Sequence, residues 1–155
     1  MAALRILAFA AASGRVGSVF LIGDKLMDWH VSVKAAESTI EAAGYAQQQI
    51  IRFTPDAVVT EDPDTAQHKG ANSLGLIAAI ARTAEANDLL DVSVPRERCY
   101  PNKYAEAEAL VERYPELAPW QPPKRRFYDN EPRNTVIFEA LALAEAIIDR
   151  GALGG

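Results

Sequence analysis

Glu61 is the first residue whose type and position could support chemistry. It follows "AVVT", a run that predicts a short strand buried in a sheet. Ligands of open α/β sheets gather at the carboxyl ends of strands, so a carboxylate at this point is well placed to bind one. Asp62 and Asp64 come next, in "DPDT", a composition typical of a turn. We therefore take Glu61 as a candidate site residue and assign the two aspartates to loop geometry.

Glu139 is the second candidate, and it lies in the segment "NTVIFEALALAEAI". Helical spacing places it on one face with Val136, Ala140 and Leu143. A glutamate among small and apolar neighbours either extends its carboxylate to the surface or points toward a metal or a partner. Both alternatives stay open from the residues alone.

The basic residues offer a different chemistry, the recognition of phosphate. The net charge of −5 excludes a broadly basic nucleic-acid-binding protein. Residues 96–133 nevertheless carry eight of the sixteen Lys and Arg residues, against seven acidic residues. A local basic face therefore remains open in this part of the chain.

The strongest basic run, residues 124–126, is followed directly by Phe127 and Tyr128. This combination places phosphate-binding charge next to rings on which bases can stack. A solvated turn anchored by its two rings explains the same pattern. His68 and Lys69, near Glu61, are further candidates for positioning a phosphate or a water, although a lone exposed histidine usually does neither. The candidate nucleic-acid-binding residues are Lys103, Lys124, Arg125 and Arg126.

The composition bounds the class of protein. A length of 155 residues is most simply one domain, 1–155, with about half of the residues apolar. No apolar run reaches the roughly 20 residues that span a bilayer, so we expect no membrane segment. The single cysteine excludes an internal disulfide and a cysteine-rich zinc site, and a reducing cytoplasm fits.

The elements that must position these residues follow from hydrophobic patterning. Three strands joined by short turns are expected over 4–10, 16–22 and 25–31, because β-branched and apolar runs are separated by Ser13-Gly14 and Gly23-Asp24. A helix is expected over about 35–53, with Ile40, Ala43, Ile50 and Ile51 on its apolar side.

The second half of the chain alternates strands with helices. We expect strands over 57–61 and 89–95, and helices over 70–87 and 102–115. The stripe Leu74, Ile77, Ala78 and Ala81 is expected to face the core. A last helix begins near Pro132 and ends at Gly151. The order predicts an α/β fold with a mixed five-stranded sheet and helices on both faces.

Four segments carry a family resemblance: "RILAFAAASGRVGSVFLI", "DAVVTEDPD", "NKYAEAEALVERYPEL" and "VIFEALALAEAI". With them the chain resembles the ribonuclease H-like fold, and within it the RuvC-type Holliday-junction resolvases, nucleases of DNA recombination. The resemblance implies a hydrolase that cuts structured DNA with two Mg²⁺ or Mn²⁺ ions. It implies Glu61 and Glu139 as catalytic metal ligands, together with an aspartate on the first strand.

That aspartate is missing. The expected position falls at or next to Ala10, within "FAAASG", and alanine has no oxygen to offer a metal. A second helix acid one turn before Glu139 is also missing, since Thr135 and Val136 stand there. Asp129 and Glu131, in the preceding loop, are the nearest substitutes.

Two main hypotheses follow. The chain is either a RuvC-like endonuclease that works with Glu61, Glu139 and a third acid, or a catalytically inactive ribonuclease H-fold module that binds nucleic acid or a protein through the loop 122–128. A ribonuclease H-fold module with an unrelated role is a third. The resemblance also implies a homodimer, because resolvases of this type act as symmetric dimers.

Overall fold

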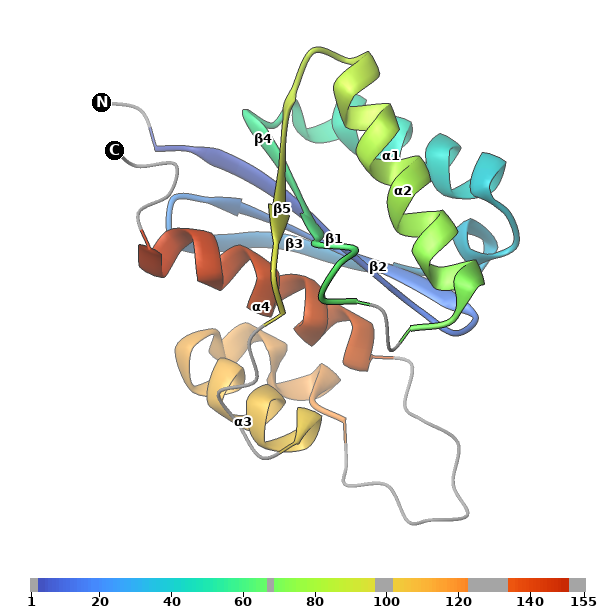
Figure 1. The fold of residues 1–155 in the computed structure, drawn as a ribbon. Helices are drawn as coiled ribbons and strands as arrows, with labels where there is room; N and C mark the ends of the chain where they lie inside the picture. The colour runs from blue at the N-terminus through green and yellow to red at the C-terminus, as the bar shows by residue number, and fades with distance from the viewer. Residues whose placement is uncertain (1–2, 67–68, 97–101, 123–133, 151–155) are drawn as a thin grey trace.

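The computed structural model of the chain describes residues 3–66, 69–96, 102–122 and 134–150 (Figure 1). The strands are β1 (Arg5–Ala12), β2 (Arg15–Ile22), β3 (Lys25–Ser32), β4 (Ala57–Glu61) and β5 (Leu90–Val94). The α-helices are α1 (Thr39–Phe53), α2 (Ala71–Ala86), α3 (Lys103–Arg113) and α4 (Thr135–Arg150). Short 3₁₀ helices cover Lys34–Ala36 and Pro115–Trp120.

The strands form one mixed sheet in the order β3-β2-β1-β4-β5. β1 is antiparallel to β2 and parallel to β4, and β4 is parallel to β5. Gly14 and Gly23 occupy the hairpin turns with φ of 79° and 63°, backbone conformations that glycine adopts without steric cost. The predicted α/β fold class, with a mixed five-stranded sheet, is confirmed.

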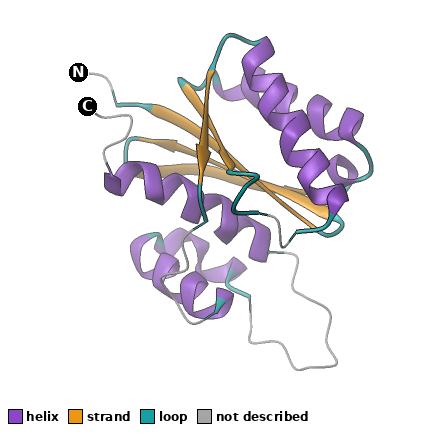
Figure 2. Ribbon diagram, in the orientation of Figure 1, coloured by secondary structure: helices purple, strands orange, loops and turns teal. Residues whose placement is uncertain are grey.

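Helices cover both faces of this sheet (Figures 1 and 2). α1 and α2 pack on one face, while α4 packs on the other and α3 lies against α4. Alternation along β1 supplies both cores: Leu7 and Phe9 join the cluster under α1 and α2, whereas Ala8 and Ala10 join the cluster under α4. A residue of β1 that faces α4 therefore lies on the side of the sheet where Glu139 enters.

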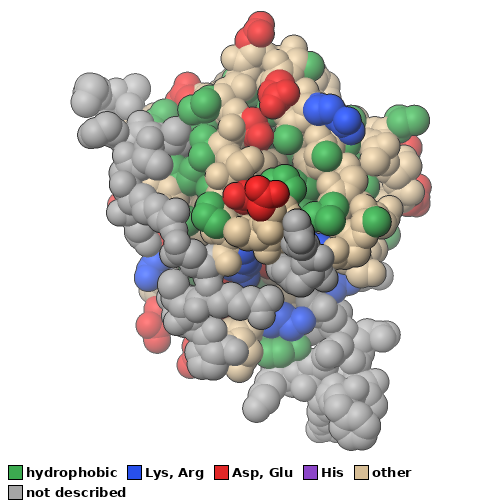
Figure 3. All heavy atoms as spheres, in the orientation of Figure 1, with side chains coloured by type: hydrophobic (Ala, Val, Ile, Leu, Met, Phe, Trp, Pro, Cys, Tyr) green, Lys and Arg blue, Asp and Glu red, His purple; other side chains and the backbone are tan. Residues whose placement is uncertain are grey.

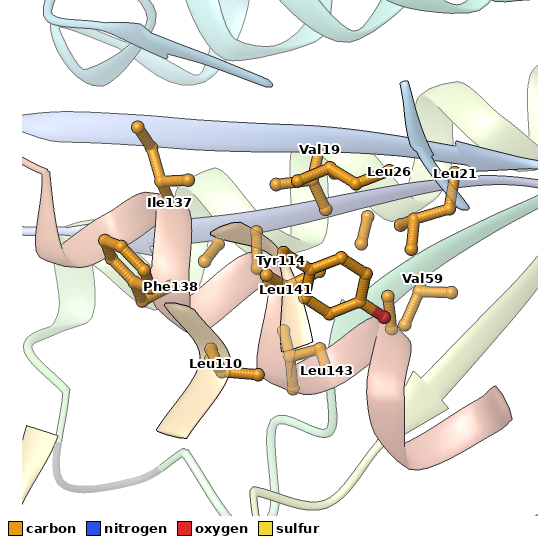
Figure 4. Close-up of a cluster of buried hydrophobic side chains, with 14 of the residues drawn as sticks. Val19, Leu21, Leu26, Val59, Leu110, Tyr114, Ile137, Phe138, Leu141 and Leu143 are labelled. Carbon is orange, nitrogen blue, oxygen red and sulfur yellow. The ribbon is translucent and has the colours of Figure 1, made fainter. Parts of the chain in front are cut away.

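The core under α4 is filled by large apolar side chains from the sheet and from both helices on that face (Figure 4). Small residues bring α4 close to the hairpin. A Cβ built on Gly17 would lie 2.8 Å from both the Cγ1 and the carbonyl oxygen of Val136. This contact fixes the height of α4 above the sheet, and with it the position of Glu139.

The start and the buried face of α1 differ from the prediction. Ser38 caps the helix by accepting a hydrogen bond from the backbone N–H of Glu41, so the helix begins at Thr39. Of the predicted apolar face, Ile50 is buried, but Ile40 and Ile51 are 81% and 67% exposed. The buried face instead uses Ala42, Tyr45, Ala46, Gln49 and Ile50.

The predicted stripe of α2 was also wrong in part. Ile77 is buried as expected, whereas Ala78 is exposed and Leu74 and Ala81 are only half-buried. The face toward the core is made by Ser73, Leu76, Ile77, Ala79, Ile80 and Ala84. In the described ranges, no helix is long and apolar enough to cross a membrane. The predicted helix ends at Pro132 and Gly151 fall outside the described residues.

Candidate functional site

Glu61 is the last residue of β4, and its side chain is only 3% exposed. Val59, two residues earlier, belongs to the core under α4, so the alternation of the strand turns Glu61 toward the same face. A carboxylate buried this deeply requires a charge or hydrogen-bond partner, because losing its hydration costs several kcal/mol or more. The position is thus a natural place for a cation.

Glu139 reaches the same place from α4. Its helical neighbours Phe138 and Ala140 are buried in the core, while the Glu139 side chain keeps 23% of its surface exposed. The carboxylate lies at the edge of the helix–sheet interface rather than out in solvent. Of the two alternatives left open for this residue, the structure supports a carboxylate directed at a charged partner within the protein.

That partner is Lys69, which precedes α2. Its Nζ lies 3.3 Å from Oε1 of Glu139 and 3.8 Å from Oε1 of Glu61, and it donates a hydrogen bond of 2.6 Å to the backbone carbonyl oxygen of Ala11. The two carboxylate oxygens are therefore separated by no more than the sum of the two Nζ distances. The structure brings Glu61 and Glu139 together, and it brings them together around an ammonium group.

A second ion pair flanks this trio. The guanidinium of Arg96 makes two hydrogen bonds to the carboxylate of Glu106 on α3, at 2.8 and 2.5 Å. Burial opposes the charged form of Arg96, but the hydrogen bonds and charge of Glu106, with the charges of Glu139 and Glu61, raise its pKa above the ordinary value. Three carboxylates and two cations thus share this end of the sheet.

Ala10 lies on β1 beside this cluster. The paired part of the β1–β4 ladder ends at Ala8 and Val59, two residues before Ala10 and Glu61 on their strands. Ala10 is 3% exposed and faces α4, so both residues look toward the same helix from the same end of the sheet. The position that the resemblance assigns to an aspartate is thus close to the two glutamates, and it carries a methyl group.

The residues present do not fit a two-ion centre. Such a centre needs several carboxylates to hold two divalent ions about 3.5–4 Å apart. Among the described residues, no three Asp, Glu, His or Cys side chains are grouped so that they could hold a metal ion. The two carboxylates that do converge are already in contact with the ammonium of Lys69. Asp129 and Glu131, the proposed substitutes, lie outside the described residues.

The loop after β4 has the geometry expected for a turn. Oδ1 of Asp62 accepts a hydrogen bond of 2.9 Å from the backbone N–H of Asp64, and the carbonyl of Asp62 accepts one from Thr65. The backbone N–H of Asp62 donates to the carbonyl of Val94 at the end of β5. Asp62 therefore shapes the loop, as the sequence predicted.

The candidate nucleic-acid-binding residues are mostly outside the described part of the chain. Lys124, Arg125 and Arg126 fall there, while Lys103 begins α3 with its Nζ 5.8 Å from the centre of the Tyr104 ring. Figure 3 shows Lys and Arg side chains spread over several places on the face it presents rather than gathered in one patch. The basic surface predicted for residues 96–133 thus stays a prediction.

Three members of the charged cluster have roles that the sequence did not predict. Lys69, a candidate for positioning a phosphate or a water together with His68, instead pairs with Glu61 and Glu139, while His68 lies outside the described residues. Arg96 belongs to the segment 96–133, in which the sequence left a basic face open, but its guanidinium is paired with Glu106. Glu106 itself stands in "KYAEAEALVER", where the alternating charges look like those of a solvated helix. The one available signal is its position on the helix, three residues before Ala109 and one turn before Leu110, whose side chain is buried.

Two solved structures resemble the chain over nearly its whole length. Thermus thermophilus RuvC matches with a TM-score of 0.62 and 15% sequence identity, over 97% of each chain. T. thermophilus RuvC in complex with Holliday junction substrate matches with a TM-score of 0.60 and 15% identity, again over 97% of each chain. The chain has a RuvC-like fold. No protein-family model and no curated protein matches the sequence.

Proposed function

We propose that this protein binds structured DNA through its RuvC-like fold and does not cut it by metal-dependent hydrolysis. Support for binding comes from the fold, which extends over 97% of the chain and is shared with a RuvC structure in complex with Holliday junction substrate. The candidate contacts are Lys103, Lys124, Arg125 and Arg126.

The main reason to propose that the protein does not cut DNA is the position of Lys69. Metal-dependent phosphodiester hydrolysis uses divalent ions to activate a water and to stabilise the leaving oxygen. Glu61 and Glu139 are the acids that the resemblance assigns to such ions, and both are in contact with one buried ammonium. Position 10 is an alanine and adds no third carboxylate, so Glu61 and Glu139 are paired with the lysine.

The alternative function is that of a metal-dependent endonuclease. It requires Lys69 to leave the carboxylates and an acid from outside the described residues, Asp129 or Glu131, to replace the first-strand aspartate. The proximity of Glu61 and Glu139 is the observation that favours it. Cleavage of a junction by the unmodified chain is the result that would establish it.

Binding is tested with a labelled four-way junction and a linear duplex of the same arms. We expect the protein to retard the junction at a lower concentration than the duplex, with affinity falling steeply between about 50 and 200 mM salt. The variant Lys124→Ala/Arg125→Ala/Arg126→Ala should weaken binding and reduce the salt slope by about 2–3, if each side chain neutralises one phosphate.

The matched control is Arg82→Ala, which removes an exposed positive charge from α2, on the opposite face of the sheet from α4. It should leave junction binding almost unchanged. Absence of a junction complex at micromolar protein and 50 mM salt would contradict the proposed function.

A further inference from the structure

We propose that the ammonium of Lys69 is the permanent cation of the Glu61–Glu139 pair, and that it keeps divalent ions out of this site. This inference rests on one part of the proposed function, namely that Glu61 and Glu139 hold no metal ion. It goes further by naming the side chain that decides between lysine and metal. It also predicts what the site becomes without that side chain.

The geometry of the ammonium supports this role. Three oxygens surround Nζ, and each comes from a different element: the carbonyl of Ala11 on β1, Oε1 of Glu61 on β4 and Oε1 of Glu139 on α4. An ammonium group has three N–H donors and no acceptor, so an arrangement of three oxygens suits it. Lys69 thereby ties the central strand to its parallel neighbour and to the helix above them.

The lysine is also held in place by its own backbone. Its N–H donates to the carbonyl of Ala66 at 2.8 Å, and the next residue, Gly70, is the N-cap of α2. The side chain is 9% exposed, so little of it is in contact with water. Moving the ammonium away would leave a carboxylate of 3% exposure without this partner, which is a costly state for a buried charge.

Lysine and a divalent ion compete for the same oxygens. Mg²⁺ requires oxygen ligands at about 2.0–2.1 Å and Ca²⁺ at about 2.3–2.6 Å, distances that place an ion inside the cluster that Nζ occupies. An ion there would also be repelled by the neighbouring ammonium. The ammonium of Lys69 and a divalent ion therefore exclude each other, and the ammonium is always present because it is part of the chain.

Removing the ammonium should therefore open a divalent-ion site. Two carboxylates and a backbone carbonyl are the oxygen ligands that Mg²⁺, Ca²⁺ and Mn²⁺ accept, with waters completing the coordination. The side chain of methionine is similar to that of lysine in length and carries no charge. Lys69→Met consequently tests the charge while keeping most of the packing.

The experiment measures binding of Mn²⁺ alone, by the electron paramagnetic resonance signal of the free ion, together with thermal unfolding. For the parent chain we expect no site-specific binding at millimolar Mn²⁺ and no increase in Tm beyond that given by NaCl at equal ionic strength. Lys69→Met should bind Mn²⁺ at least about tenfold more tightly than the parent, and its Tm should rise with Mn²⁺ because the ion binds the folded state.

Two control variants separate charge from packing. Lys69→Arg keeps a cation and should stay without Mn²⁺ binding. Lys69→Met/Glu61→Gln removes one ligand and should lose the binding gained by Lys69→Met. If Lys69→Met folds only in the presence of Mn²⁺, the recovery of its unfolding transition by the ion supports the same conclusion.

Two results would overturn the inference. One is binding of Mn²⁺ by the parent chain below about 1 mM that Glu61→Gln abolishes, a measurement that does not depend on the folding of any Lys69 variant. The other is a folded Lys69→Met that binds Mn²⁺ no better than the parent. Loss of junction binding is read in a separate assay, so it would remove the proposed function and leave this inference standing.

Discussion

The Nζ of Lys69 lies 2.6 Å from the backbone carbonyl oxygen of Ala11, one residue beyond the position where the resemblance expects an aspartate. The lysine comes from the loop before α2 and the alanine from β1, 58 residues apart in the sequence. Through this hydrogen bond the first strand contributes a main-chain oxygen to the charged cluster in place of a side-chain carboxylate. The cation that the two carboxylates of this cluster contact is the ammonium of Lys69.

Substitution by alanine is expected to change the stability of the protein in opposite directions at Gly17 and at Gly44. Gly17→Ala places a methyl group against the backbone of Val136, so we expect a loss of about 1–3 kcal/mol in the free energy of unfolding. Gly44→Ala, within α1, meets nothing within 4 Å and should gain about 0.5–1 kcal/mol from helix propensity. Urea denaturation of the two variants measures both. A neutral Gly17→Ala would show that α4 does not approach the hairpin as described.

The ion pair between Arg96 and Glu106 predicts a non-additive mutant cycle. The two side chains are 14% and 9% exposed, so Arg96→Met leaves a largely buried carboxylate without its two hydrogen bonds and should cost about 3 kcal/mol of unfolding free energy. Arg96→Met/Glu106→Met removes both charges and should cost less than Arg96→Met alone. Chemical denaturation of the cycle decides it, and a double variant less stable than Arg96→Met would contradict the pairing.

Tyr45 predicts a loss of stability at alkaline pH. Burial, against the opposing effect of the hydrogen bond between the Ser18 and Tyr45 hydroxyls, raises the pKa of the Tyr45 phenol from 10.0 to about 12. The unfolded chain therefore loses this proton first, and stability falls as the pH rises from about 10 to about 12, by roughly 2–3 kcal/mol at 1.36 kcal/mol per pKa unit.

Tyr45→Phe isolates this contribution from the titration of lysines over the same range. The difference in unfolding free energy between the parent and Tyr45→Phe should shift against the parent between pH 10 and 12. A difference that is constant over this range would mean that the phenol titrates normally in the folded protein.

Ala10 and Ala8 form a matched pair for introducing the missing carboxylate. Both are buried and face α4 from the same strand, but Ala10 lies nearer to Lys69. Ala8→Asp buries a charge in an apolar core and should cost about 3 kcal/mol or more. Ala10→Asp should cost less, because the ammonium beside Ala11 partly compensates the new charge, and Lys69→Met should remove that advantage. Equal costs of the two aspartates in urea denaturation would count against the proximity of Lys69 to position 10.

The fold was predictable because its signals are local. The hairpins follow from β-branched runs broken by Ser13-Gly14 and Gly23-Asp24, and β4 follows from "AVVTE". The faces of α1 were predicted less well, because Ile40 and Ile51 are large and apolar yet exposed. The buried face depends on Ala42 and Ala46, small residues that allow close packing against the sheet but give a weak hydrophobic pattern.

The candidate site was also predictable only in part. Glu61 and Glu139 stood out from the sequence, since each is an acid in an apolar setting. The pairing of both with Lys69 did not, because a lysine in a polar loop carries no sign of the partner that it meets across 70 residues of chain. Pairings of this kind depend on tertiary structure, and only the assembled sheet and helix bring the three side chains to one point.

Junction binding without cleavage can be measured in one experiment, in which a labelled four-way junction is incubated with the protein in Mn²⁺ and the complex and the cleavage products are quantified from the same mixture. We expect a junction complex and no cleavage by the parent chain. Ala10→Asp/Lys69→Ala, which introduces an acid and removes the ammonium, is the companion variant that tests whether the chain gains cleavage. Cutting of the junction by the unmodified chain, lost in Glu61→Gln, would show that the protein is a nuclease and that Lys69 does not keep metal ions out of the site.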